Sequence, residues 1–240
     1  MYRTTLVFPV LPGKSQADIT RIADRFKHDT DAYLESRHRA GITLERAYRQ
    51  HTSMGDFVVS YLESDRSAPE AMATFAEGAT ELDRFFVDTV KEVHGVDITA
   101  PPAGPPPETV GEWVDTTVTD RGRGLAFCAP IIPGREDSSR AWAKATFASQ
   151  GMTTSRRALR QNCEVVTLTM TPDGSIIGVY REGADPVAGN RNFAASTEPF
   201  DVAFKEALAT LIPSFVDVNQ PVTGVDEIFD SQSLRAMQHS

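Results

Sequence analysis

Residues that could carry out chemistry are few in this chain and stand far apart in the sequence. None of its histidines lies in an HxxxH, HExxH or two-histidine–one-carboxylate spacing; they are His28, His38, His51, His94 and His239. A metal site needs such spacings, because its ligands must converge on one ion. The sequence therefore predicts no metal site, and we expect no resident cofactor.

Two carboxylates, Asp97 and Asp217, occupy matching places in two related segments of the chain. A pair of this kind could work as acid and base. The alternative, which we favour, is that both are strand-end residues copied by a duplication. Pro12-Gly13-Lys14 resembles a phosphate loop only at its end, because the GxxxxGK[ST] spacing is absent, so it is read as a turn.

The composition restricts the partners that the chain can have. It has 240 residues, 40% of them hydrophobic, and a net charge of −9. An acidic protein is a poor partner for nucleic acid or for an anionic membrane, and no run approaches the ~20 apolar residues of a membrane span. Cys128 and Cys163 form no Cys-x-x-Cys motif. These features favour a cytoplasmic protein with two buried thiols.

The elements of the first unit follow from turn signals and periodicity. A strand over residues 4–11 precedes a helix that begins after Ser15 and continues to about Arg39. A hairpin over residues 46–62 turns at 52–55, a second helix from about Pro69 breaks near Gly78, and residues 94–98 read as a closing strand. The order is β-α-β-β-α-β, the ferredoxin-like arrangement.

The same pattern then restarts. Residues 6–14, LVFPVLPGK, are echoed by residues 127–135, FCAPIIPGR, and Tyr61-Leu-Glu63 is echoed by Tyr180-Arg-Glu182. We expect a helix over 200–211 and a closing strand over 215–218. The predicted division is a first repeat over 1–98, a proline-rich linker over 99–122, a second repeat over 123–219 and a C-terminal tail over 220–240.

Two registers compete for the second hairpin. Identity favours matching residues 46–51, RAYRQH, to residues 157–162, RALRQN. Matching the turns instead, residues 52–55 against 171–174, needs almost no gap and makes both hairpin arms equal in length, as antiparallel pairing requires. We adopt the turn register, which pairs Arg46 with Tyr61 and Gln50 with Phe57.

The duplicated unit resembles the dimeric α+β barrel superfamily, which includes antibiotic-biosynthesis monooxygenases, stress-responsive barrel proteins and chlorite-dismutase-like haem proteins. Residues 50–63, QHTSMGDFVVSYLE, followed by His94-Gly-Val-Asp-Ile98 and a proline run, also look like a group of uncharacterised bacterial proteins of that superfamily. The resemblance implies two four-stranded sheets facing each other within one chain, an intramolecular pseudo-dimer with a cavity between the sheets. It also makes haem ligation by His94 conceivable.

Strand alternation then selects the residues that face the other sheet. The predicted cavity lining is Arg46, Tyr48, Gln50, Phe57, Tyr61, Thr167, Thr169 and Tyr180. Aromatic walls with a few polar groups are typical of small-molecule sites. The alternative is that these residues fill a packed core between the sheets, with Arg46 at its rim.

The resulting hypothesis is a small-molecule-binding barrel that could act as a cofactor-independent monooxygenase or isomerase on a planar hydrophobic ligand. Tyr48, Tyr61 and Tyr180 would stack on the ligand or donate hydrogen bonds to it, and Arg46 or Gln50 would stabilise an enolate-like oxyanion. The first alternative is a non-enzymatic structural or interaction protein, and a haem-binding barrel is a distant third. The duplication is compatible with a monomer or a homodimer.

Overall fold

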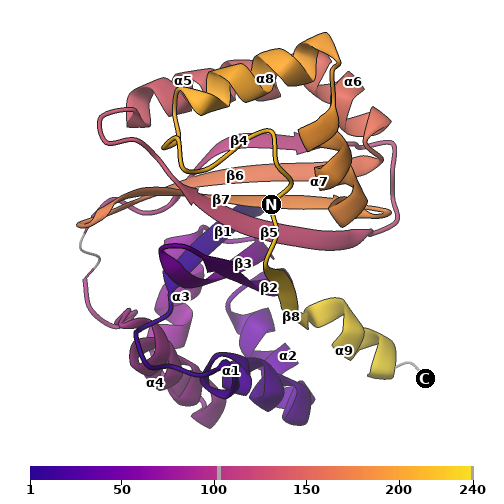
Figure 1. Cartoon of the computed structure of the whole chain (residues 1–240). Helices are drawn as coiled ribbons and strands as arrows, with labels where there is room; N and C mark the ends of the chain where they lie inside the picture. Colours follow the sequence, from indigo (N-terminus) through magenta and orange to yellow (C-terminus); the bar gives the residue numbers. More distant parts are fainter. Residues whose placement is uncertain (102–103, 239–240) are drawn as a thin grey trace.

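The chain folds into four layers, with two antiparallel sheets in the middle and helices on the outer face of each sheet (Figure 1). The computed structural model describes residues 1–101 and 104–238. The first sheet has the strand order β1-β3-β2-β8 and the second the order β4-β6-β7-β5. This confirms the predicted α+β class, with the β-α-β-β-α-β order repeated in one chain.

The first half of the molecule is the first sheet with helices α1 to α4. Its elements are β1 (Tyr2–Pro9), α1 (Gln16–His28), α2 (Thr30–Arg39), β2 (Ile42–Thr52), β3 (Gly55–Ser64), α3 (Ala68–Ala76), α4 (Glu81–His94) and β8 (Val225–Asp230). Ser15 caps α1 in a capping box with Asp18. The single helix predicted up to Arg39 is in fact two, because α1 ends at Asp29, whose carboxylate pairs with Arg25.

The second half is the second sheet with helices α5 to α8. Its elements are β4 (Glu108–Val114), β5 (Arg123–Pro130), α5 (Glu136–Phe147), α6 (Gln150–Ala158), β6 (Gln161–Thr171), β7 (Gly174–Gly183), α7 (Pro186–Ala195) and α8 (Pro199–Ala209). A last helix, α9 (Ser231–Gln238), follows β8 at the C-terminal end.

Both hairpins have the register that the turns predict. Arg46 lies opposite Tyr61 and Gln50 opposite Phe57, while Thr171 lies opposite Gly174 at the second turn. The competing identity-based match would have placed an insertion inside β6, whose pairing with β7 shifts only near Gln161. Turn geometry therefore set the register, and with it the face on which each side chain lies.

The two predicted closing strands, over residues 94–98 and 215–218, were wrong. His94 is the last residue of α4, and Gly95 ends that helix in the left-handed conformation, with φ 70°. Asp97 then accepts the Thr99 N–H at 3.0 Å, and Asp217 accepts the Asn219 N–H at 2.9 Å. Both segments are local turns stabilised by aspartate side chains, which compete with strand pairing.

The fourth strand of each sheet lies later in the chain than predicted. Residues assigned to the linker form β4, which pairs with β6, and residues assigned to the tail form β8, which pairs with β2. In β4, Gly111 and Trp113 are buried whereas Glu112 between them is exposed, a strand period in a segment that reads as polar. Each repeat is thus followed by a strand that completes the other sheet.

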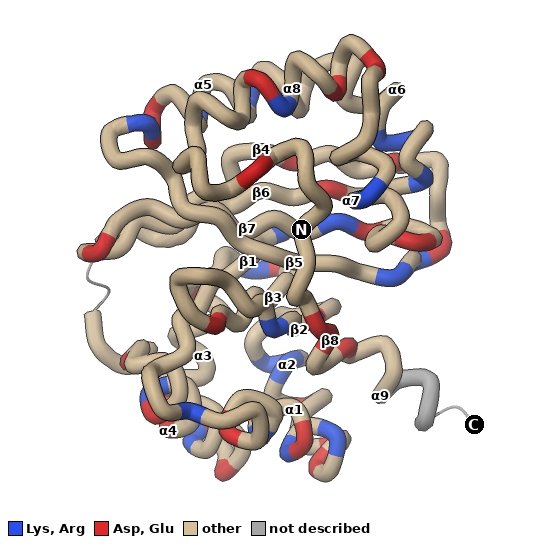
Figure 2. The backbone as a smooth tube through the Cα atoms, viewed as in Figure 1, with Lys and Arg blue, Asp and Glu red and all other residues tan. Residues whose placement is uncertain are grey.

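Charged residues of both signs are mixed along the backbone of both halves (Figure 2). Several of them gather where β3 and β7 end, in the space between the two sheets. Of the helices within residues 1–101 and 104–238, none has both the length and the apolar character needed to cross a bilayer.

Candidate functional site

The eight residues predicted to line an inter-sheet cavity do face the opposite sheet, but their side chains fill the space. The rings of Tyr61 and Tyr180, both 0% exposed, stack with their centroids 3.5 Å apart and their planes 4° from parallel. Tyr48 packs in the same buried cluster. Such contact leaves no room for a planar ligand between these rings.

The polar members of this set bond to the protein itself. Arg46 donates to Glu182 at 3.0 Å and pairs with Asp230 at 3.0 Å, which gives its buried guanidinium the anionic partners it needs. Gln50 accepts the Cys128 N–H at 2.6 Å, and Thr167 accepts the Thr5 N–H at 3.0 Å. The geometry supports the packed-core alternative, and a ligand-binding role for these residues stays a prediction. Phe57 and Thr169 are partly buried on the same face.

An open, polar pocket borders Arg46, and two pockets with mainly apolar walls lie on the outer faces of the sheets, one under the helices of each half. The pocket of the second half, here called the second-half pocket, encloses about 320 Å³. This is in the range of small-molecule sites, which begins at roughly 300 Å³. The equivalent first-half pocket encloses only about 60 Å³.

The second-half pocket has mainly apolar walls from three sources. The sheet supplies Phe127, Val166, Ile177 and Val179, and the helices supply Trp142, Phe193, Phe204 and Leu208. The segment 212–223, which connects α8 to β8, and the β2–β3 turn at residues 52–54 form the remaining wall. Gln50 borders this pocket too, so one of the predicted site residues lies beside it.

A buried ion network lies behind the pocket and occurs in both halves. In the second half, Arg156 donates to Glu164 at 2.5 Å, and Ser155 donates to Asp201 at 2.5 Å. In the first half, Arg37 donates to Glu45 at 2.7 Å, and Ser36 donates to Asp83 at 2.5 Å. Since both repeats carry the same Ser-Arg, Glu and Asp set, we assign it to the scaffold.

Two polar residues of the second-half pocket have apolar counterparts in the first half. The repeated Tyr-x-Glu motif aligns Arg181 with Leu62, and continuing that alignment sets Asn190 opposite Ala71. Arg181 and Asn190 are each 4% exposed and border the pocket. A charge buried beside apolar walls is costly unless it is paired, and the first half avoids this cost with Leu62 and Ala71, so these two positions distinguish the second-half pocket from the first-half pocket.

Arg181 is held less tightly than Arg156. Its guanidinium lies 3.2 to 3.4 Å from the Glu164 carboxylate and 3.4 Å from the Asn190 side-chain oxygen. Glu164 is already paired with Arg156. In the first half the equivalent Glu45 is paired with Arg37, and Leu62 stands at the position of Arg181. A guanidinium has five N–H donors, so Arg181 has donors left for a ligand.

The charges around Glu164 favour an anion. Arg156 and Arg181 share the buried carboxylate of Glu164, and the buried Lys205 nearby donates to the Ala194 and Ser196 carbonyls and pairs with no carboxylate among the described residues. Burial lowers the pKa of Arg181, and the nearby charge of Arg156 lowers it further while Glu164 opposes the shift. An anionic group in the pocket would offset this strain between like charges.

The segment 212–223 is anchored to the wall that it covers. Asn190 donates from its side chain to the Val222 carbonyl at 3.2 Å, and the His51 N–H donates to the Gly224 carbonyl at 2.8 Å. Phe215, in the same segment, is 61% exposed although it borders the pocket. Asp217 also lies here, far along the chain from Asp97, and each of the two serves its own local turn.

Reasoning from the sequence missed Arg181 and Asn190 as site residues. Strand alternation puts Arg181, next to Tyr180, on the helix-facing side of β7, but the sequence prediction did not extend to this residue and sought the site on the other face. Comparison of the two repeats would have revealed both residues, because the equivalent positions of the first copy hold the apolar Leu62 and Ala71.

No protein-family model matches the chain, and no curated protein matches it. Among solved structures, the chain is similar to a candidate monooxygenase from Lactobacillus acidophilus NCFM, with 12% identity and a TM-score of 0.45. The alignment covers 95% of this chain and 92% of that one. At this level of likeness, what the chain binds must be argued from its own residues.

Proposed function

We propose that this chain is a small-molecule-binding protein and that the second-half pocket is its site. The ligand is a mainly apolar, ring-containing molecule with a carboxylate or another oxyanion. One observation carries the proposal: Arg181 and Asn190 stand, buried, in the apolar wall of a pocket of about 320 Å³, where the first half has Leu62 and Ala71.

The same pair suggests a type of reaction. An isomerisation that moves a proton between carbons, or an attack of dioxygen on an activated ring, passes through an enolate-like anion. Donors aimed at that oxygen lower the barrier. Arg181 and Asn190 would take the role that sequence reasoning gave to Arg46 and Gln50, which is to stabilise the anion after a separate base has accepted the proton from carbon.

Binding of 2-naphthoate, followed by the fluorescence of Trp142 in the pocket wall, tests the proposal. Arg181→Leu should weaken binding roughly tenfold or more, because a charge-assisted hydrogen bond contributes about 1.5–3 kcal/mol. Asn190→Ala should weaken it less. Leucine at position 181 should be compatible with the fold, because the equivalent first-half residue is Leu62, which lies opposite Glu45 of the Arg37–Glu45 pair.

Arg191→Leu is the matched control. Arg191 is an exposed residue of α7, the helix that carries Asn190, and its replacement removes one positive charge at a position outside the pocket. The neutral methyl ester of naphthoate should bind without sensitivity to Arg181→Leu. Equal naphthoate affinity in the Arg181 and Arg191 variants would contradict the assignment, as would failure of the wild-type protein to bind either compound.

A further inference from the structure

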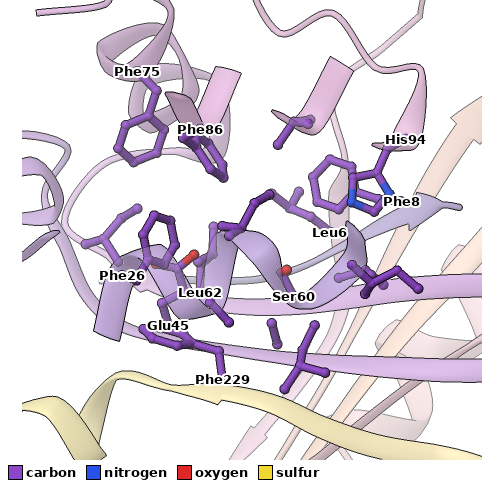
Figure 3. Close-up of a pocket in the computed structure, with 18 of the residues that line it drawn as sticks. Leu6, Phe8, Phe26, Glu45, Ser60, Leu62, Phe75, Phe86, His94 and Phe229 are labelled. Atoms are coloured by element: carbon purple, nitrogen blue, oxygen red, sulfur yellow. The ribbon is translucent and has the colours of Figure 1, made fainter. Parts of the chain in front are cut away.

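The first-half pocket contains polar groups of a different kind. In Figure 3, His94 and Phe8 lie at one end of it, Glu45 and Phe26 toward the other, and Ser60 between them. The other lining residues are almost all apolar. Glu45 is neutralised within the scaffold by Arg37 and by the Tyr33 hydroxyl at 3.0 Å, which leaves His94 and Ser60 as the groups to be explained.

His94 presents a hydrogen-bond acceptor to this pocket. It is 5% exposed, and its Nδ1 lies 2.8 Å from the Pro9 carbonyl oxygen. A carbonyl can only accept, so Nδ1 carries the proton and Nε2 keeps its lone pair. Among the described residues, none hydrogen-bonds to Nε2 or to the Ser60 hydroxyl. Burial lowers the pKa of His94, which keeps the ring neutral near pH 7.

The second half has apolar residues at both matching positions. The Leu11 N–H donates to the Val93 carbonyl, and the Ile132 N–H donates to the Leu211 carbonyl, each at 2.9 Å. The residues that follow, His94 and Ile212, are therefore equivalent. The Tyr-x-Glu alignment likewise places Ser60 opposite Val179. The two pockets therefore differ in their polar groups. The second-half pocket has the cation of Arg181, and the first-half pocket has the uncharged acceptor of His94.

We propose that the first-half pocket is a second ligand site, which binds a small uncharged molecule through an O–H donated to His94 Nε2. The Ser60 hydroxyl provides a second contact along the pocket. At about 60 Å³ the space is smaller than the roughly 150 Å³ cavity known to hold benzene, so the ligand has only a few heavy atoms, as a short-chain alcohol has. A porphyrin does not fit this space, which argues against His94 as a haem ligand.

Fluorine NMR with 2,2,2-trifluoroethanol at low millimolar concentration tests the second site. The wild-type protein should give a saturable shift, and His94→Asn should weaken binding about three- to tenfold, the effect of losing one neutral hydrogen bond. Asparagine can still donate to the Pro9 carbonyl, so the fold keeps that contact while the acceptor Nε2 is lost. Ser60→Val should produce a smaller loss.

His28→Asn serves as the matched control, because His28 is exposed at the end of α1. The methyl ether of trifluoroethanol, which has no O–H, should bind more weakly than the alcohol and should not respond to His94→Asn. The assignment is overturned if alcohol and ether bind alike, or if His94→Asn binds the alcohol as the wild type does. Arg181→Leu should leave this binding unchanged, which separates the two sites.

Discussion

At the scale of single residues, the repeated Tyr-x-Glu motif accounts for the charged cluster between the sheets. Glu63 accepts the Tyr61 hydroxyl at 2.7 Å and pairs with Arg3 at 3.2 Å and with Arg121. Glu182 accepts the Tyr180 hydroxyl at 2.7 Å and pairs with Arg46. The two copies of the motif therefore stack their tyrosines on each other and pair their carboxylates with arginines. In the sequence, this symmetry between the repeats is visible only as a repeated three-residue motif.

This cluster should make the protein sensitive to acid. Burial alone would raise the pKa of Glu63, but hydrogen bonds from Arg121 and Tyr61 and the charge of Arg3 outweigh it, and the pKa falls below its usual value. The stabilisation is thus complete above the carboxyl pKa of the unfolded chain and is lost as the pH falls through the lower folded-state pKa. Urea unfolding between about pH 6 and pH 3 should show it.

Glu63→Gln should reduce both the free energy of unfolding at neutral pH and its slope with pH in the acid range. Glu77→Gln, on an exposed side chain at the end of α3, is the comparison. A variant at position 63 that kept the full acid slope of the wild type would show that other carboxylates govern acid unfolding.

At the scale of elements, strand β4 packs against α5, and the close approach at Gly111 requires a residue without a side chain. A Cβ added at Gly111 would lie 2.8 Å from the Phe147 ring, closer than packed atoms come. Gly111→Ala should therefore destabilise the protein by about 1–3 kcal/mol, because overpacking outweighs the smaller gain from a less flexible backbone.

Denaturant midpoints measure this effect. Gly104→Ala provides the control, since its added Cβ would meet the Met170 carbonyl oxygen at an ordinary 3.5 Å, and its change should stay within about 0.5 kcal/mol. Equal midpoints for the two variants would mean that α5 can shift away from β4 without loss.

The elements that sequence could predict are those with strong local signals. Thr52–Gly55 and Thr171–Gly174 fixed both hairpins, and Gly78 marked the break before α4. The closing strands failed because Gly95 and Asp97 end a helix and make a turn within a segment rich in β-branched residues. Strand β4 gave too little signal, because its alternation of buried and exposed residues extends over only a few positions. Its partner strand β6 also lies far along the chain.

At the scale of the whole molecule, the C-terminal segment completes the first half. Phe229 of β8 and Leu234 of α9 pack against Phe26 and Tyr33, and β8 covers the edge of β2. A chain ending at residue 224 should expose that edge and this apolar cluster. We expect it to associate or aggregate and to unfold at lower urea concentration, because unpaired strand edges recruit other chains.

Light scattering after size exclusion provides the measurement. A chain ending at Leu234 retains β8 and the buried leucine and should behave much more like the full-length protein. If the chain ending at residue 224 kept the size and stability of the full-length protein, β8 would be dispensable. The same experiment on the full chain decides between the monomer and the homodimer that the duplication allows.

The position of β8 also fixes an order of events during synthesis. β1, β2 and β3 leave the ribosome before the second half of the molecule, whereas the strand that closes their sheet is translated only after all of that half. The nascent first half therefore keeps one sheet edge unpaired until the second half has been synthesised. Termination of translation between α8 and β8 would therefore leave the first half incomplete although all of its other strands had been made, and that half is where a holding chaperone would be needed.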